Sequence, residues 1–441
     1  MAASVFDSPL YARLFPTSET GRLFSDSAAI RAMLLVEGTL ARVQGQQGII
    51  PQISAAAIHR ASLEILIDPG ALAEATGQNG VCVPGLVNAF RTEMNAPEHA
   101  QFVHWGATSQ DIIDTGLMLR LRQALALSEK DLRTVLIALA QMARAHAQTP
   151  MAARTYAQEA TPTTWGAVIA QWGSPLLDQF EALPLLRAQS LWVSLSGASG
   201  TSSALGEKAP ALRAALAKEL GLGDPGRSWH TNRGPVLRIT DWCIGILTTL
   251  GAMGRSLTAL SASGVAEVRF DTPGGSSTMP QKQNPVAPEA LIALAQQAQG
   301  LRSALGDAAM HQHQRDGAAW FTEWMVVPQI VLATASALQI AGKLAETVTP
   351  DSERMRATLV DGLGLAHAEA LSFALCAEMP RPKAQDAVKA LVRQASADNT
   401  PLWQLARDAY PDVPAKTFDA LAQCGQAPAE AQDFALRVEA L

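Results

Sequence analysis

The segment 274–289, GGSSTMPQKQNPVAPE, gathers side chains that can handle an anion and a proton. Ser276 and Ser277 carry hydroxyls, Lys282 carries a cation, and Asn284 carries an amide. The next proline favours the start of a helix, so free N–H groups and a positive dipole end would lie beside these side chains. We expect a mobile loop that closes over an anion, although the same residue types also make ordinary surface connections.

A serine in such a loop could transfer a proton only after activation, because its hydroxyl is a poor base at its ordinary pKa. Backbone N–H groups of the closed loop and the Lys282 cation could stabilise an alkoxide where water is excluded. These residue types do not determine which proton moves.

A second polar group occurs in the segment 104–115, HWGATSQDIIDT. Thr108, Ser109 and Gln110 place three hydrogen-bonding side chains directly before a helical pattern, and Asp111 lies near the helix start. Ser or Thr followed by an acidic residue is also a common helix N-cap, so capping and ligand binding both remain open for this segment.

A third polar group is the segment 153–166, ARTYAQEATPTTWG, which supplies Arg154, Thr155 and Gln158. The phenol of Tyr156 can donate a proton or a hydrogen bond, and the alternative is an aromatic ring that packs at an interface.

Histidines and arginines follow in two further segments. SWHTNRG, 228–234, offers His230 and Arg233, and HQHQRDGAAWFTEW, 311–324, offers Arg315. The His-x-His spacing in the latter is a known metal-ligand spacing, but no cysteine or carboxylate cluster completes a set. We expect no metal and no cofactor.

The loop GSSTMPQKQNP resembles the GSSxMPxKxNP loop of the fumarase/aspartase superfamily at all eight defined positions of eleven. The resemblance implies an all-α fold with a central five-helix bundle that forms homotetramers. It also implies proton transfer by Ser276, carboxylate binding by Lys282 and Asn284, and support of the opposite side of the site by Glu289. Ser277 and Met279 of the same loop would contact the substrate.

The run HWGATSQD is similar to the muconate cycloisomerase branch of this superfamily, and the resemblance extends from about residue 7 to about residue 380. It implies a group of substrate contacts outside the loop: His104, Trp105, Thr108, Ser109, Gln110, Arg154, Thr155, Gln158, His230, Arg233 and Arg315.

Three residues depart from the superfamily patterns. Tyr156 stands where the adenylosuccinate lyase branch has its general-acid histidine and where the muconate branch commonly has tryptophan. Glu159 and Gln281 each replace a histidine that is frequent in the muconate branch. Tyr156 is therefore a candidate catalytic acid, and the acid partner of Ser276 is otherwise unassigned.

The resemblance implies cyclisation of 3-carboxy-cis,cis-muconate to a carboxymuconolactone in protocatechuate degradation. A carboxylate oxygen would add to an alkene, the carbanion would be held as an aci-carboxylate, and an adjacent carbon would be protonated. The alternatives are another lyase of the superfamily, such as one that acts on adenylosuccinate, and a catalytically silent protein with the same fold. Each site would draw residues from different subunits of the tetramer.

Five long stretches with apolar residues spaced by three and four must position these side chains. They cover about 111–148, 161–190, 235–263, 285–314 and 321–348, and convincing strand patterns are scarce. We expect an N-terminal helical domain over 1–110, a helix bundle over 111–350, and a C-terminal helical domain over 351–441.

Composition narrows the class of protein. The 441 residues are 48% apolar and 17% charged, as in an ordered globular protein. The formal net charge of −6 argues against general nucleic-acid binding. Four scattered cysteines suit a reducing cytoplasm. The uncharged run 325–342 contains proline and polar residues, so we expect a buried helix and not a membrane span.

Overall fold

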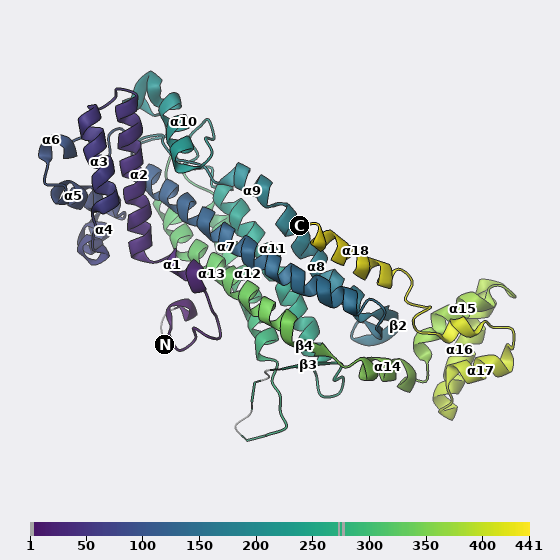
Figure 1. Ribbon diagram of the computed structural model, residues 1–441. Helices are drawn as coiled ribbons and strands as arrows, with labels where there is room; N and C mark the ends of the chain where they lie inside the picture. Colours follow the sequence, from purple (N-terminus) through teal and green to yellow (C-terminus); the bar gives the residue numbers. More distant parts are fainter. Residues whose placement is uncertain (1–3, 272–273, 276–277) are drawn as a thin grey trace. The chain divides into compact units, whose positions relative to one another are not determined.

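A computed structural model describes residues 4–271, 274–275 and 278–441 (Figure 1). The predicted all-α fold is confirmed. The long helices are α7 Ser109–Ala145, α8 Trp165–Glu181, α11 Gly234–Leu260, α12 Val286–Ala308 and α13 Gly317–Thr347.

The shorter helices before and after these are α1 Ser18–Arg22, α2 Asp26–Gln46, α3 Gln52–Glu64, α4 Ala73–Asn79, α5 Val83–Glu93, α6 Pro97–Ala100, α9 Leu183–Ser190, α10 Ala209–Leu220, α14 Ser352–Asp361, α15 Ala368–Leu375, α16 Arg381–Asp398, α17 Leu402–Ala409 and α18 Ala427–Glu439. The 3₁₀ helices are η1 Val5–Asp7, η2 Pro69–Leu72, η3 Ser203–Lys208, η4 Leu365–His367 and η5 Ala415–Phe418.

The second predicted rod, 161–190, is wrong at its start and in its continuity. Strand β2 (Gln158–Thr164) occupies its first residues and pairs antiparallel with β1 (Pro150–Thr155). Three of the seven residues of β2 are threonine, a β-branched type that is favoured in strands. The rod then divides into α8 and α9 at Ala182, two residues before a proline that cannot continue the hydrogen-bond ladder.

Two other features differ from the sequence expectation. Helix α12 ends at Ala308 and not near 314, so His311 and His313 lie in the connection to α13. A second short antiparallel pair joins β3 (Val268–Phe270) to β4 (Val348–Pro350). These pairings are short, which is why the sequence shows little strand patterning.

The chain divides into two compact units. Unit 1 comprises residues 1–131, 179–248 and 293–339, and unit 2 comprises residues 132–178, 249–292 and 340–441. The N-terminal parts of α7 and α11 therefore belong to unit 1 and their C-terminal parts to unit 2. The three-domain division expected from the sequence stays a prediction.

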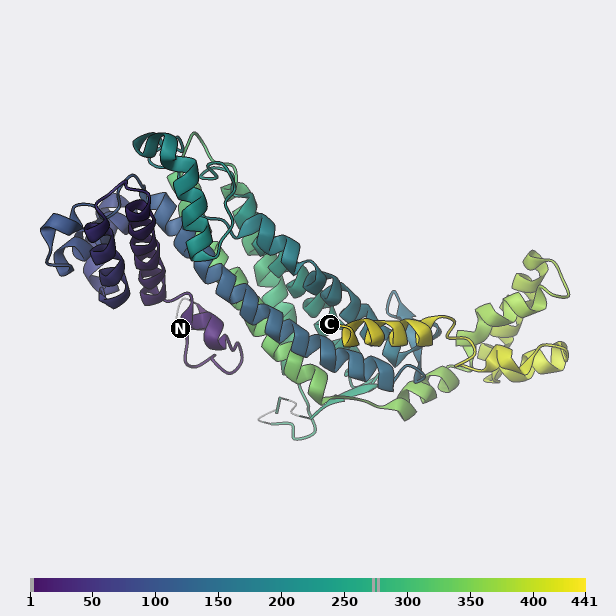
Figure 2. The same cartoon turned by 45° about the horizontal axis from the view of Figure 1, so that its top comes forward.

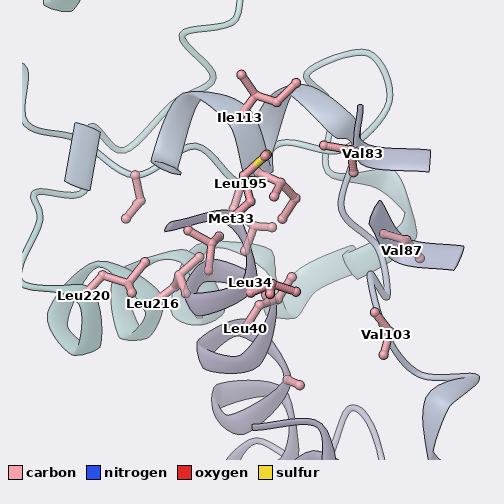
Figure 3. Close-up of a cluster of buried hydrophobic side chains, with 14 of the residues drawn as sticks. Met33, Leu34, Leu40, Val83, Val87, Val103, Ile113, Leu195, Leu216 and Leu220 are labelled. Carbon is pink, nitrogen blue, oxygen red and sulfur yellow. The ribbon is translucent and has the colours of Figure 1, made fainter. Parts of the chain in front are cut away.

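The core of unit 1 is an apolar cluster drawn mainly from α2, α5, α7 and α10 (Figure 3). Helices α2 and α3 pack side by side in it, as both views show (Figures 1 and 2). Gly116 of α7 lets α7 and α2 approach closely, since a Cβ there would lie 3.3 Å from Cγ of Met33.

Unit 2 has its own core. Helices α15, α16 and α17 pack around Leu371, Leu391 and Leu402. Helix α18 packs on α8, where a Cβ on Gly173 would lie only 2.0 Å from the ring of Phe434. Only glycine therefore leaves room for that ring.

Helices α11 and α13 are long and apolar enough to cross a membrane by length and composition alone. The most apolar window of α13 is 78% buried within the protein, which is the pattern of a core helix. The expectation of a buried helix over 325–342 agrees with this burial.

Candidate active site

The predicted catalytic loop connects β3 to α12 and is closed at its base by two backbone hydrogen bonds. Gly274 N–H donates to the carbonyl of Asn284 (2.9 Å), and Asn284 N–H donates back to the carbonyl of Gly274 (2.8 Å). A Cβ on Gly274 would lie 2.4 Å from Cγ2 of Val286, so glycine is required at this crossing. Ser276 and Ser277 lie outside the described residues.

The charged residues of this loop face solvent. Lys282 and Met279 of the loop are exposed, and so is Glu289 in the first turn of α12. The side-chain amide of Asn284 donates to the carbonyl of Gly275 (3.4 Å). Lys282 forms no ion pair within the described ranges, so its ammonium group is available to an anion.

Helix α7 begins at Ser109, and the side chain of Asp111 in its first turn caps its N-terminus. Thr108 N–H donates to Oδ2 of Asp111 (3.0 Å), which is one half of a capping box. Gln110 and Asp111 are completely buried, whereas Thr108 and Ser109 keep partial exposure. Capping therefore accounts for Asp111, and the hydroxyls of Thr108 and Ser109 remain accessible.

The carboxylate of Asp111 also gathers donors from two distant segments. Its Oδ1 accepts from the Ser194 hydroxyl (2.9 Å), the Ser196 N–H (2.8 Å) and His230 Nε2 (2.9 Å). Its Oδ2 accepts from the Gly197 N–H (2.9 Å). With the cap, five donors surround one buried carboxylate, which thereby fixes the loop 194–197 and the His230 ring.

Arg233 lies at the centre of a second buried network. It makes paired hydrogen bonds to Asp114 (2.7 and 3.0 Å) and to Glu323 (2.7 and 2.7 Å), and all three side chains are buried. Trp320 Nε1 adds a bond to Asp114 (3.3 Å). Burial opposes the charge of Arg233, but the Asp114 carboxylate and Glu323 outweigh it and raise the pKa of this guanidinium.

Arg315 joins the exposed surface to this buried network. Its Nε donates to Oε1 of Gln110 (2.8 Å) and its Nη2 to the carbonyl of Ala198 (3.1 Å). The Gln110 amide in turn donates to the His230 carbonyl (2.9 Å). Gln110 therefore orients Arg315, whose guanidinium stays exposed.

His104 and Trp105 lie just before α7 in the chain. His104 adopts a left-handed backbone conformation (φ 64°), and its Nδ1 lies 2.6 Å from Oε1 of buried Glu37. Burial lowers the pKa of His104, but the Glu37 carboxylate outweighs burial and raises it. The indole of Trp105 is 44% exposed.

The hairpin β1–β2 carries the third group of candidates. Arg154 makes a bidentate ion pair with fully buried Glu267 (2.7 and 2.8 Å). Thr155 and Gln158 pair across the strands and flank the turn. Tyr156 sits at the turn itself with its side chain fully exposed.

The turn of this hairpin has an unusual backbone. Tyr156 and Ala157 have φ of 52° and 61°, so two consecutive residues that are not glycine adopt the left-handed region. A two-residue hairpin turn of this kind favours Asn-Gly, and left-handed Tyr and Ala are strained. Strain of this kind is concentrated at functional positions, which singles out Tyr156 among the exposed aromatics.

A cavity of about 890 Å³ with both polar and apolar walls opens beside the hairpin within unit 2. Its wall includes Arg154, Gln158, Glu159, Thr161, Arg354 and Glu369. Glu159, one of the departures from the superfamily pattern, thus gives a carboxylate to this cavity.

The candidates fall into two sets. In unit 1 the structure brings together Gln110, His230, Arg233 and Arg315 through shared hydrogen bonds. In unit 2 it places Arg154, Thr155, Tyr156 and Gln158 on the hairpin, and Met279, Lys282, Asn284 and Glu289 on the loop and the start of α12. Across the described ranges, no group of three or more His, Cys, Asp or Glu is arranged to hold a metal ion.

The carboxylates that hold the candidate cations and histidines were not among the predicted site residues: Glu37, Asp111, Asp114, Glu267 and Glu323. A usable signal existed for Asp111 and Asp114, since they are three residues apart and therefore share one face of a helix. Glu37 and Glu267 pair with residues far along the chain, so no local pattern identifies them.

The sequence of this chain is similar to those of lyases and cycloisomerases. A family model described as lyase matches residues 15–300. The 3-carboxy-cis,cis-muconate cycloisomerase of Pseudomonas aeruginosa is 40% identical over 392 residues, which cover 88% of this chain and 85% of that relative. Nitrosuccinate lyase of Streptomyces davaonensis is 34% identical, over 81% of this chain and 78% of its own length.

The fold is also shared with solved structures. The crystal structure of 3-carboxy-cis,cis-muconate lactonizing enzyme from Pseudomonas putida matches with a TM-score of 0.90 and 34% identity, over 98% of this chain and 99% of that one. A fumarate lyase from Mesorhizobium matches with a TM-score of 0.89 and 30% identity, over 97% of this chain and 99% of that one.

Proposed function

Because the chain belongs to the lyase family of the fumarase/aspartase superfamily, we propose that it is a cycloisomerase acting on 3-carboxy-cis,cis-muconate. The observation that carries the proposal is identity of 33–40% to four cycloisomerases of this name over most of the chain. The alternative of adenylosuccinate cleavage lacks such support, since Tyr156 replaces the histidine expected for that reaction.

The proposed reaction is an intramolecular addition. A carboxylate oxygen of the substrate forms a C–O bond with one alkene carbon, and the displaced electron pair is held on a neighbouring carboxylate as an aci-carboxylate. A proton then goes to the adjacent carbon, so atoms and charge balance without an external oxidant or reductant. Donors aimed at the aci-carboxylate lower the barrier because they match charge that develops in the transition state and is absent from that position in the bound substrate.

Lys282 and Arg315 are proposed as the cations that bind substrate carboxylates. Both are exposed and neither is paired with a carboxylate within the described chain. Thr108 and Ser109 are proposed as neutral donors that act with Arg315 of unit 1. Asn284 is proposed as the neutral donor that acts with Lys282 of unit 2. A tricarboxylate substrate requires several such groups at once.

Arg233 and Arg154 are proposed as positioning residues, which revises the role expected from the sequence. The donors of Arg233 are shared between Asp114 and Glu323, and Arg154 is held by Glu267. A guanidinium already bound to buried carboxylates has little capacity for a substrate carboxylate. His230 likewise uses its Nε2 in a hydrogen bond to the carboxylate of Asp111.

Tyr156 is proposed as the acid that works with Ser276. The strained turn holds the phenol fully exposed, in a conformation that folding alone would not select. Ser276 is proposed as the proton-transfer residue on the superfamily loop sequence alone. Glu289, exposed at the start of α12, would support the opposite side of the site.

We also propose a cytoplasmic homotetramer whose sites combine residues of several subunits. A fully exposed Tyr156 must be enclosed by another segment before water can be excluded from the reaction. Exposed apolar side chains such as Phe321 and Met325 fit a further buried interface. The four unpaired cysteines fit a reducing compartment.

The test is the ultraviolet absorbance of 3-carboxy-cis,cis-muconate mixed with the purified protein, beside a parallel trial with adenylosuccinate. We expect loss of the diene absorbance on the first substrate only, and a fall of several orders of magnitude in kcat for Ser276→Ala. Ser261→Ala, a serine just after the end of α11, is the matched control and should keep full activity. Cleavage of adenylosuccinate alone would refute the proposal.

A further inference from the structure

A second cavity lies in unit 1, between the N-terminal segment and helices α2, α7 and α13. Its volume is about 330 Å³, at the lower end of the range for small-molecule sites. None of its lining residues is one of the substrate contacts proposed above. Its wall includes Phe24, Asp26, Met33, Leu117, Arg120 and Trp324.

Arg120 of α7 gives this cavity a cation, on which the Asp26 carboxylate acts without forming an ion pair. No carboxylate of the described chain forms an ion pair with it, and its Nε has no hydrogen-bond partner although it is buried. Its Nη1 reaches only the Leu23 carbonyl at 3.5 Å, and the Phe24 ring lies 5.7 Å away. Burial lowers the pKa of Arg120 to about 10, and the Asp26 carboxylate offsets this shift only in part.

Trp324, which also lines the cavity, carries a second donor. Nε1 of Trp324 is buried and likewise has no acceptor in the described chain. Buried N–H groups are almost always paired, so two orphan donors in the wall of one cavity are unusual. An acceptor within reach of both N–H groups would satisfy them.

The rest of the wall indicates the chemistry of that acceptor. Met33, Ile113, Leu117 and Val327 are buried apolar residues that suit a hydrocarbon body. Asp26 also lines the cavity, and its carboxylate repels every negative charge on a ligand, so one carboxylate beside Arg120 is accommodated better than two.

We propose that this cavity binds a small apolar monocarboxylate whose oxygens accept hydrogen bonds from Arg120 and Trp324. The hydrocarbon part of the ligand packs between Met33, Leu117 and the Phe24 ring. A bare inorganic anion leaves these apolar walls unused, and a dicarboxylate meets Asp26.

The site also lies next to the buried network of the candidate active site. Glu323, which pairs with Arg233, is the residue before Trp324 and lines the same cavity. Helix α7 carries Arg120 as well as Gln110 and Asp111. A ligand here therefore contacts the two helices whose side chains hold Arg233 and Arg315 in place. The binding proposal itself does not depend on the identity of the reaction.

The experiment is isothermal titration calorimetry of the full-length protein with benzoate as the probe. We expect one saturable site per chain at millimolar benzoate or below. Arg120→Met should weaken binding by about 30-fold or more, because a charge-assisted hydrogen bond is lost. Trp324→Phe keeps an aromatic ring without the N–H and should weaken binding by about 5-fold or more.

Two further variants distinguish binding in this cavity from binding elsewhere on the protein. Ala29→Leu fills the cavity without touching either donor, and it should abolish benzoate binding while circular dichroism and the melting temperature remain close to those of the unchanged protein. Lys282→Met, in the catalytic loop of unit 2, should bind benzoate as the unchanged protein does.

Several results would overturn the proposal. Absence of saturable benzoate binding by the unchanged protein is one, and unaltered binding by Ala29→Leu or Trp324→Phe is another. Loss of binding in Lys282→Met would move the benzoate to the catalytic loop. Chloride that displaces benzoate fully at equal concentration would identify an inorganic anion site instead of a carboxylate site.

Discussion

Asp111→Asn is the substitution that tests the buried network most directly. The carboxylate accepts five hydrogen bonds, three on Oδ1 and two on Oδ2. An asparagine of the same shape offers one accepting oxygen and one NH₂ donor. In its better orientation the oxygen keeps the three donors on the Oδ1 side, and the NH₂ group faces the N–H groups of Thr108 and Gly197.

The cost follows from those two orphaned backbone donors. Each buried N–H without an acceptor costs about 1–3 kcal/mol, so the free energy of unfolding should fall by about 2–6 kcal/mol. Weakening of the three remaining charge-assisted bonds acts in the same direction. Glu129→Gln on the same helix is the control, because its carboxylate makes one partly exposed ion pair with Arg187. The free energy of unfolding lost in Glu129→Gln should stay below about 1 kcal/mol.

The assay is equilibrium urea unfolding followed by tryptophan fluorescence at neutral pH, at one fixed protein concentration. A midpoint for Asp111→Asn that clearly falls below that of Glu129→Gln supports the role of Asp111 as the anchor of the loop 194–197. Equal midpoints for the two variants would mean that the five hydrogen bonds contribute little, and the anchoring role would be refuted.

Two other predictions concern Tyr156 and His104. Tyr156→Asn combined with Ala157→Gly relieves two strained left-handed residues. The melting temperature should therefore rise by an amount equivalent to about 1 kcal/mol, while turnover is lost. An unchanged or lower melting temperature would contradict the strain. Because Glu37 raises the pKa of His104 above 6.5, the pair stabilises the fold fully below that pH, and its contribution disappears as pH rises through the folded-state value. The stability lost in His104→Gln, from urea midpoints, should thus be largest near about pH 5 and vanish near about pH 9; a loss that is equal at both pH values would refute it.

The hairpin shows where sequence periodicity misleads. The apolar spacing predicts a helix from residue 161, whereas residues 161–164 belong to β2 and α8 begins at Trp165. The turn at Tyr156 and Ala157 carries none of the residues that normally mark a two-residue hairpin, so no local signal was present. Tyr and Ala in place of the usual Asn-Gly hide the turn from sequence patterns, and the same two residues cause the strain that singles out Tyr156.

The sequence by itself determined the helical class, the approximate position of the five long helices and the segments that carry the candidate chemistry. Those features depend on local spacing, capping and loop composition, which act over a few residues. The loop sequence from Gly274 to Asn284 was distinctive enough to point to a family, because its order of residues is specific.

Only the tertiary structure decided which charges are engaged and which are available. The pairing of Arg154 with Glu267 spans 113 residues, and that of Arg233 with Asp114 spans 119. Burial makes such pairs obligatory, since an isolated buried charge is far more costly than a solvated one. Only the tertiary structure likewise shows that Arg120 lies beside a cavity without an ion pair among the described residues, which no pattern in the sequence reveals.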